Sequence, residues 1–380
     1  MTNNEYFEHL QKNLEELFNG KIGFYKFQRT DIQAKPNKYI ELLKGFNNYH
    51  FCVTFPYAGK SLNWEIIFDP EDIRELPDFD FNDYSFLPEP DVNYIADNIP
   101  SWDKWDLTNS RAMLNILNEF LVMYKRAQVE KLLNHNKYLN IRKQYEDLLQ
   151  SLNLPEDKIE VYIESDVDHS REDSIGINFN MYLPIDFSDL PEYYQEDFNE
   201  LLNPGEDFAS LNVMKKLDNA STKVFLLLSP RAEQVLGKMK LPKFHKDATL
   251  ADYALDVRNT IEEQIKHISE QHKAKNLFVS TLVEKFSSGI VEYDTTRFSK
   301  VCFIYEDCED YDCLVTVTLG AKFPNERPKV QLHSIYCQLG RYCNSNMSFS
   351  YDSEAPTEHN VRSLKDSLKA ETLLFKDHKH

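Results

Sequence analysis

The chain has 380 residues, which at roughly 150 residues per domain corresponds to two or three domains, each long enough to bury a core. Its 43 basic and 62 acidic side chains give a formal net charge of −19, which disfavours nucleic acid and anionic bilayers as direct partners, because phosphate groups are repelled. Hydrophobic residues make up 42% of the sequence and there are only 10 glycines, a composition typical of a folded globular protein.

The first residues, MTNNEYFEHLQKNLEEL, have no basic start, apolar stretch or small-residue cleavage site, so we expect no secretory signal. The apolar residues from Tyr6 to Leu17 instead follow helical spacing, and Asn19-Gly20 is a helix stop. No apolar run reaches the length of about eighteen residues that predicts a membrane span. We therefore expect a soluble, intracellular protein without membrane insertion.

The first part of the chain predicts a helix followed by an antiparallel meander, with strands near residues 21–27, 49–57 and 62–68. Five prolines between residues 70 and 100 then predict an ordered, extended surface loop, because proline fits neither a helix interior nor a sheet ladder. Apolar residues recur at helical spacing from Asn109 to Gln150, which predicts about 60 Å of helix, either straight or with one break. Leu152-Asn153-Leu154-Pro155 closes this segment.

The same order of elements occurs twice more. Alternating apolar residues predict further strands at 158–164, 175–187, 207–214, 222–228, 290–296, 299–305, 313–319 and 328–335. A second long helix begins near Asp247 or Thr249 and ends at Ser287-Ser288-Gly289, and a final helix covers 358–376. This pattern predicts an α+β protein in which helices cover one face of each antiparallel sheet, in three units of residues 1–152, 153–275 and 276–380.

Several segments carry a resemblance to a known family. The run Phe323-Pro-Asn-Glu-Arg-Pro-Lys-Val-Gln-Leu332 is similar to the corner between the third and fourth strands of the ubiquitin-conjugating fold, which places two spaced prolines before a Lys-Val strand. The chain resembles the BRE family in the order of further stretches: Val53 to Phe68, Glu75-Leu-Pro-Asp-Phe-Asp-Phe81, Phe86-Leu-Pro-Glu-Pro-Asp91, Leu183 to Pro191, Asn203-Pro-Gly-Glu-Asp207, Leu227-Leu-Ser-Pro-Arg231 and Ser288-Gly-Ile-Val-Glu-Tyr-Asp294.

This resemblance implies tandem ubiquitin-conjugating-enzyme-variant (UEV) or RWD-like units, linked by long helices into an elongated rod. It also implies a non-catalytic scaffold subunit of the lysine-63-specific BRISC deubiquitinase and of the nuclear BRCA-A complex. The implied partners are a MERIT-type von Willebrand A-like subunit and an Abraxas-family subunit that pairs with a JAMM zinc isopeptidase. Ubiquitin chains and serine hydroxymethyltransferase are further candidate partners. The resemblance implies roles in ubiquitin signalling, DNA-damage repair and mitosis, in cytoplasm and nucleus.

The cysteines argue against conjugating activity. Ubiquitin transfer on this fold needs a thiolate for the thioester and a donor for the oxyanion. Cys52 lies in an early predicted strand, upstream of the proline corner that precedes the nucleophile, and residues 53–301 contain no cysteine. Cys337 and Cys343 fall close to the nucleophile position of the third unit, but without a His-Pro-Asn run. Two alternatives to the non-catalytic scaffold stay open: an active conjugating enzyme that uses Cys343 or Cys337, and a free-standing ubiquitin-binding module.

We predict neither a metal nor a cofactor. The late cysteines and His333 have no Cys-x-x-Cys pair, so we expect buried strand thiols in place of a zinc site. Ala58-Gly59-Lys60-Ser61 lacks the second glycine of a phosphate-binding loop, and we expect a tight turn between two strands there.

Partner contacts are expected from exposed patches on the long helices and from aromatic residues of the proline-rich loops. Core packing is the alternative for each of them. An extended peptide could bind in grooves formed by Phe86, Tyr94, Trp102 and Trp105 in the first unit. The predicted partner-binding residues are Leu132, Leu133, Tyr138, Trp102, Trp105, Phe323, Tyr336 and Tyr342.

Overall fold

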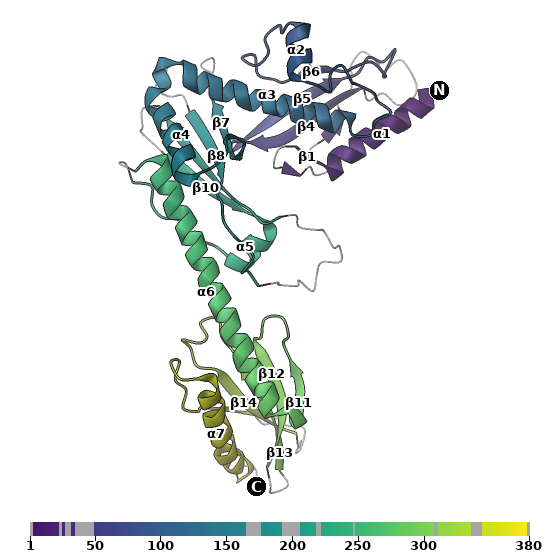
Figure 1. Ribbon diagram of the computed structural model, residues 1–380. Helices are drawn as coiled ribbons and strands as arrows, with labels where there is room; N and C mark the ends of the chain where they lie inside the picture. The colour runs from purple at the N-terminus through teal and green to yellow at the C-terminus, as the bar shows by residue number, and fades with distance from the viewer. Residues whose placement is uncertain are drawn as a thin grey trace. The chain divides into compact units, whose positions relative to one another are not determined.

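The computed structural model is an α+β protein with antiparallel sheets (Figure 1). It describes residues 3–22, 25–26, 32–34, 49–164, 176–191, 206–217, 222–245, 248–307, 311–335 and 344–377. Its contacts separate two compact units: unit 1 comprises residues 1–184, 209–227 and 242–256, and unit 2 comprises residues 185–208, 228–241 and 257–380. The α+β class predicted from the sequence is confirmed, whereas the three-unit boundaries stay a prediction.

The first sheet of unit 1 has the strand order β3-β4-β5-β6 and buries one face. Alternate residues of two neighbouring strands, such as Val53 and Trp64, pair directly and face the same core. Phe55 packs edge-on against Trp64 at 4.8 Å between ring centroids, a favourable geometry for two aromatic rings. Helices cover this face, as predicted. The elements are α1 (Asn3–Asn19), β1 (Lys21–Ile22), β2 (Tyr25–Lys26), β3 (Ile32–Ala34), β4 (His50–Tyr57), β5 (Lys60–Ile67), β6 (Asp78–Asp80), α2 (Val92–Asn98) and α3 (Ala112–Asn134).

The helix predicted over 109–150 is broken once, which confirms one of the two predicted forms. It consists of α3, a short 3₁₀ turn (Asn136–Tyr138) and α4 (Leu139–Leu152). His135 is extended at the break, with φ −101° and ψ 124°, and the Arg142 Nη1 donates to the carbonyl oxygen of Leu133 at 3.0 Å. A side chain thus satisfies a carbonyl that the helix end leaves without an intrahelical partner. The break places Tyr138 in the core, where it is fully buried.

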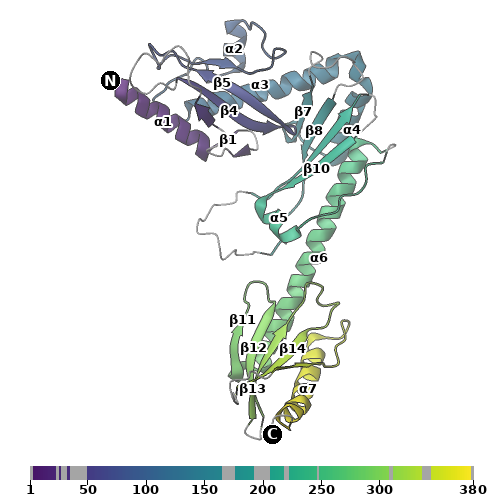
Figure 2. The same ribbon diagram turned by 180° about the vertical axis from the view of Figure 1, so that it is seen from behind.

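Unit 1 also contains a second antiparallel sheet, with the order β10-β9-β8-β7 (Figure 2). The tip of the β4–β5 hairpin contacts β7. The Tyr57 hydroxyl donates to the carbonyl oxygen of Val161 at 2.9 Å, and the Ala58 amide donates to the buried Glu160 carboxylate at 2.9 Å. These bonds couple the two sheets of unit 1. The strands are β7 (Ile159–Ile163), β8 (Gly176–Tyr182), β9 (Ala209–Lys216) and β10 (Thr222–Leu228).

The hairpin tip confirms the tight turn predicted at Ala58-Gly59. Both residues have positive φ, 46° and 76°, as the commonest two-residue hairpin turns require. A Cβ atom on Gly59 would lie 2.4 Å from the side chain of Asn212 on β9. Glycine is therefore needed at this position both for its backbone conformation and for the close approach of the second sheet.

Unit 2 contains a five-stranded antiparallel sheet, β11-β12-β13-β14-β15, with helices on one face. Phe286 stacks on Phe303 at 4.2 Å between centroids, and Phe278, Val315 and Leu364 belong to the same core. The strands are β11 (Ile290–Tyr293), β12 (Lys300–Asp307), β13 (Tyr311–Thr318), β14 (Lys329–Ser334) and β15 (Asn344–Met347). Helices α5 (Pro230–Leu236) and α7 (Thr357–Asp377) also belong to unit 2, whereas α6 (Leu250–Lys285) begins in unit 1 and continues into unit 2.

Five short elements were not predicted from the sequence: β3, β6, α2, α5 and β15. The stretch of residues 70–100, expected to be an extended loop, contains two of them. Its prolines flank these elements and do not interrupt them: Pro77 precedes β6, Pro90 precedes the N-cap of α2 and Pro100 follows α2. At these positions proline removes no helix or ladder hydrogen bond, so the expectation of a continuous loop was wrong.

Candidate partner-binding groove

The described cysteines lie within strands, as expected for structural thiols. Cys52 is in the middle of β4 and pairs with Glu65 on β5. Cys302 and Cys313 are buried in β12 and β13, with the sulfur of Cys302 3.4 Å from the Thr316 hydroxyl. Cys337 and Cys343, the alternative nucleophiles, lie outside the described residues, as does Cys308. Within the described ranges, no group of three His, Cys, Asp or Glu side chains has an arrangement that could hold a metal ion.

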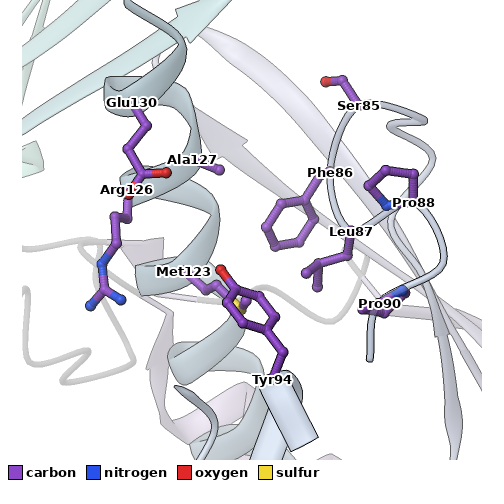
Figure 3. A pocket seen from close by; sticks show the side chains of 10 residues that line it. All are labelled: Ser85, Phe86, Leu87, Pro88, Pro90, Tyr94, Met123, Arg126, Ala127 and Glu130. Atoms are coloured by element: carbon purple, nitrogen blue, oxygen red, sulfur yellow. The ribbon is translucent and has the colours of Figure 1, made fainter. Parts of the chain in front are cut away.

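A groove in unit 1 is the strongest candidate for a binding site (Figure 3). It has a volume of about 290 Å³ and lies between the loop after β6, helix α2 and helix α3. No cysteine lines it. Its ten lining residues are Ser85, Phe86, Leu87, Pro88, Pro90, Tyr94, Met123, Arg126, Ala127 and Glu130.

The floor of the groove is apolar and well packed. Phe86 and Met123 are both buried, and the Phe86 ring packs edge-on against Tyr124 at 4.9 Å. Because these side chains belong to the core of unit 1, the floor is held in place by the fold. A rigid apolar floor favours binding, since little conformational entropy is lost when a ligand side chain is inserted.

Hydrogen bonds hold the loop wall of the groove. The Tyr124 hydroxyl on α3 donates to the Asp83 carboxylate at 2.8 Å, and the same carboxylate accepts from the Ser85 amide at 2.9 Å. Burial raises the pKa of the Tyr124 hydroxyl well above its usual value, and the neighbouring Asp83 charge raises it further. The hydroxyl therefore stays protonated and remains a donor over the whole physiological range.

The loop carries unusual backbone conformations beside the groove. Leu87 and Glu89 have φ values of 50° and 53°, although each has a side chain and precedes a proline. Side chains rarely adopt this region, and such residues cluster at functional sites. Asp91 then caps α2 by accepting from the Asn93 amide at 2.9 Å, which fixes the helix that carries Tyr94.

The rim of the groove is apolar and charged. Tyr94 lines the groove and is 53% exposed, and the neighbouring Tyr84 and Val92 are 100% and 67% exposed. Exposed apolar side chains that gather beside a groove are typical of protein interaction sites. Arg126 and Glu130 lie four residues apart on α3 and provide one charge of each sign at the opposite wall.

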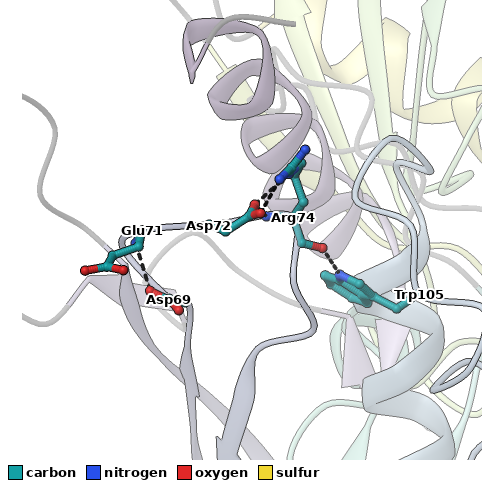
Figure 4. Close-up of polar contacts among 5 residues, drawn as sticks. All are labelled: Asp69, Glu71, Asp72, Arg74 and Trp105. Atoms are coloured by element: carbon teal, nitrogen blue, oxygen red, sulfur yellow. Dashed lines mark hydrogen bonds and ion pairs between the residues drawn. The ribbon is translucent and has the colours of Figure 1, made fainter.

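The structure brings together only some of the predicted groove residues. Phe86 and Tyr94 line the groove, but Trp102 and Trp105 do not. Trp102 packs against Phe120 at 6.2 Å. The Trp105 indole donates to the carbonyl oxygen of Arg74 at 3.0 Å (Figure 4), and its ring contacts Phe68. Both tryptophans are half-buried and stabilise the proline-rich loop.

Arg74 also forms an ion pair with Asp72 (Figure 4). The guanidinium lowers the pKa of the Asp72 carboxyl to about 2, mainly through its hydrogen bond to that group. Both side chains are partly exposed, and neither residue lines the groove.

The other predicted partner residues are placed as follows. Leu133 is half-buried, whereas Leu132 and Tyr138 are 0% exposed. A partner can therefore contact Leu132 or Tyr138 only if the segment between α3 and α4 moves. Phe323 is buried against Phe278 at 5.3 Å. Tyr336 and Tyr342 lie outside the described residues. Their partner roles stay predictions.

Sequence reasoning missed Met123, Arg126, Ala127 and Glu130. They lie on a helix predicted correctly, but their spacing is that of any amphipathic helix. Only the contact between α3 and the loop after β6 distinguishes them from the other residues of the helix, and that contact joins residues about forty positions apart in the chain.

Comparison with known proteins gives a consistent likeness. The model of the family described as brain and reproductive organ-expressed protein (BRE) matches residues 17–338. A protein of Danio rerio named BRISC and BRCA1-A complex member 2 is 30% identical over 324 residues, which cover 84% of this chain and 80% of that protein. A protein of the same name from Branchiostoma floridae is 28% identical over 291 residues, which cover 75% of this chain and 71% of that protein. The likeness extends over parts of both compact units.

Proposed function

The chain belongs to the family of brain and reproductive organ-expressed proteins (BRE), as its motifs predicted, and we propose from this that it is a non-catalytic subunit of a BRISC-type or BRCA1-A-type complex. Both relatives are named as members of these complexes. The observation that best supports binding in place of catalysis is the groove of unit 1, which combines an apolar floor and an exposed aromatic rim with no thiol among its lining residues.

In this proposal the chain is a scaffold that bridges a MERIT-type von Willebrand A-like subunit and an Abraxas-family subunit. The latter holds the JAMM zinc isopeptidase, so the cleavage of lysine-63-linked ubiquitin chains takes place in another subunit. The proposal includes UEV-like or RWD-like units in this chain, action in cytoplasm and nucleus, and roles in DNA-damage repair and mitosis. Ubiquitin chains and serine hydroxymethyltransferase are proposed as further contacts.

The groove is proposed to bind an extended segment of a neighbouring subunit. Its volume of about 290 Å³ lies at the lower end for ligand pockets and suits one or two side chains of a peptide. Phe86 and Met123 offer an apolar surface to such a side chain, and Tyr94 offers a ring that can cover it. Arg126 and Glu130 can bond polar groups of the peptide at the rim.

The test is reconstitution of the full chain with the von Willebrand A-like, Abraxas-family and isopeptidase subunits, measured by size-exclusion chromatography with light scattering. We expect one stable co-eluting complex. The variant Tyr94→Ala with Ala127→Arg should release one neighbour, because it removes the exposed ring and fills the groove. Tyr293→Ala is the matched control, since Tyr293 is an exposed tyrosine on β11. A chain that stays monomeric with all partners present would overturn the scaffold proposal.

Two further assays separate the alternatives. A reducible ubiquitin adduct on Cys337 or Cys343, formed with activating enzyme and ATP, would show conjugating activity and contradict the non-catalytic role. Tight binding of lysine-63-linked chains by the full chain alone would identify it as a ubiquitin-binding module.

A further inference from the structure

A second concave site lies in unit 2, on elements that the groove does not use. It has a volume of about 370 Å³ and lies between α5, α6, the turn between β11 and β12, and the segment after β13. Its polar lining residues are Gln234, Gln271, His272, Lys275, Arg297 and Ser299. The remaining lining residues are small or aliphatic, and no carboxylate is among them.

The charge of this pocket differs from that of the chain. The chain has a formal net charge of −19, yet the ionisable side chains that line the pocket are a lysine, an arginine and a histidine. Cationic side chains that converge in a concavity attract anions, because the low-dielectric walls focus their field. The pocket is therefore a local basic site on an acidic protein.

The charge of Asp294 acts on Lys275, and the turn already uses the Asp294 carboxylate. It accepts hydrogen bonds from the amides of Thr296 and Arg297 at 3.0 and 2.9 Å, and from the amide and hydroxyl of Ser299 at 3.3 and 2.5 Å. Lys275 forms no ion pair within 4.0 Å with any other residue that the structure describes. Desolvation lowers the pKa of this half-buried ammonium, and the Asp294 charge opposes that effect only in part.

The turn that carries Arg297 is fixed to helix α6. The Nε2 of His272 donates to the carbonyl oxygen of Thr296 at 3.0 Å, and its ring packs against Phe298 at 5.2 Å between centroids. Phe298 has a φ of 50°, a conformation that side chains rarely adopt, so the turn is held by these contacts. The turn that carries Arg297 is thus held against the helix that carries Lys275 before any ligand arrives, which lowers the entropic cost of binding.

We propose that this pocket binds a phosphate monoester carried on a phosphorylated serine or threonine of a partner protein. A phosphate monoester carries nearly two negative charges and three acceptor oxygens, which matches a guanidinium and an ammonium in one pocket better than a single carboxylate does. The amides of Gln234 and Gln271 provide further donors. Recognition of phosphorylated segments by clustered basic residues is a recurring mode of protein binding. The inference does not depend on the groove in unit 1.

The test is calorimetric titration of the full chain at pH 7 with three probes: the capped tripeptide Ala-phosphoserine-Ala, its unphosphorylated form and inorganic phosphate. We expect binding of the phosphorylated tripeptide and none of the unphosphorylated one. Lys275→Met and Arg297→Gln should each weaken binding about tenfold, which corresponds to about 1.4 kcal/mol, because each removes one charged donor to the phosphate. Lys275→Arg should retain binding, which separates loss of the charge from misfolding.

Lys273→Gln is the matched control, because Lys273 is exposed on α6 and does not line the pocket. It should change the affinity less than twofold, since solvent screens its charge. If inorganic phosphate binds as tightly as the phosphorylated tripeptide, the pocket is a site for small phosphate compounds, and the proposed recognition of a phosphorylated protein segment is overturned. Absence of binding by both phosphate probes, or equal weakening by Lys273→Gln and Lys275→Met, would overturn the proposal.

Discussion

Replacing Glu160 by alanine is expected to destabilise unit 1 by about 3 kcal/mol, because this carboxylate is buried between the two sheets of the unit. One carboxylate oxygen accepts from the amide of Ala58 at 2.9 Å and from Asn180 Nδ2 at 3.0 Å. The other lies 3.5 Å from the Nζ of Lys125. Alanine would leave two buried donors and one ammonium without these partners.

The magnitude follows from the exposure of those partners. Removal of one member of a fully buried ion pair costs about 3 to 5 kcal/mol. The Lys125 side chain is 17% exposed, so water can partly replace the carboxylate and the lower end of that range applies. Glu160→Gln should cost only about 1 kcal/mol, because its amide oxygen can still accept from Ala58 and Asn180 while the ion pair alone is lost.

Tryptophan fluorescence during urea unfolding can measure this change selectively. The three tryptophans of the chain, at positions 64, 102 and 105, all belong to unit 1, so their signal follows the unfolding of that unit. Exchange of the Ala58 amide with deuterium provides a local readout and should accelerate in both variants. Asp157→Asn, an exposed change close to β7, is the control and should stay within about 0.5 kcal/mol of the wild type.

The prediction would be refuted if Glu160→Ala lowered the free energy of unfolding by less than about 1 kcal/mol, or by no more than Asp157→Asn does. The hairpin tip would then be held by packing alone, and the carboxylate would contribute no net stabilisation to the contact between the sheets.

Three further predictions concern other parts of the chain. Tyr124→Phe should lower the free energy of unfolding by about 1 kcal/mol and accelerate proteolysis of the loop after β6, because Asp83 loses the Tyr124 hydroxyl as a donor. Unchanged proteolysis would contradict this. The Asp72 carboxyl should titrate near pH 2 in an NMR titration, and Arg74→Ala should return the midpoint towards 3.8, the ordinary pKa of an aspartate. Since the folded pKa is lowered, the stability that this pair contributes is present above about pH 4 and is lost as the pH falls towards 2, so a midpoint unaffected by Arg74→Ala would refute the assignment. Gly289→Ala should destabilise unit 2 by about 1 to 3 kcal/mol in calorimetric unfolding, because its Cβ would lie 2.1 Å from a backbone oxygen of β12; an unchanged transition would show that the backbone can shift.

Local sequence patterns predicted the regular elements well where one face is buried. The alternation of apolar residues located β4, β5, β12 and β13, and helical spacing located α1, α6 and α7. These patterns are reliable because the period of the backbone decides which side chains share a face. The glycine turn at Ala58-Gly59 was also predictable, since few other residues adopt its conformation.

Other features depended on contacts between distant segments. The break at residues 135–138 contains neither proline nor glycine, and Tyr138 at its end is fully buried. The short elements α2 and β6 are too brief for a periodic pattern, and they are stabilised by capping and by pairing with β5. Proline counts alone therefore predicted a loop where the structure has a helix and a strand.

The sequence by itself determined the family, the α+β class and the strands and long helices, because motifs and apolar periodicity are local properties of the chain. It also indicated Phe86 and Tyr94 as groove residues. Only the tertiary structure decided that Met123 and Arg126 lie opposite them, that Trp102 and Trp105 pack elsewhere, and that basic residues of unit 2 meet in one pocket. Such sites are formed by side chains far apart in sequence, and their meeting depends on how whole elements pack, which no local pattern encodes.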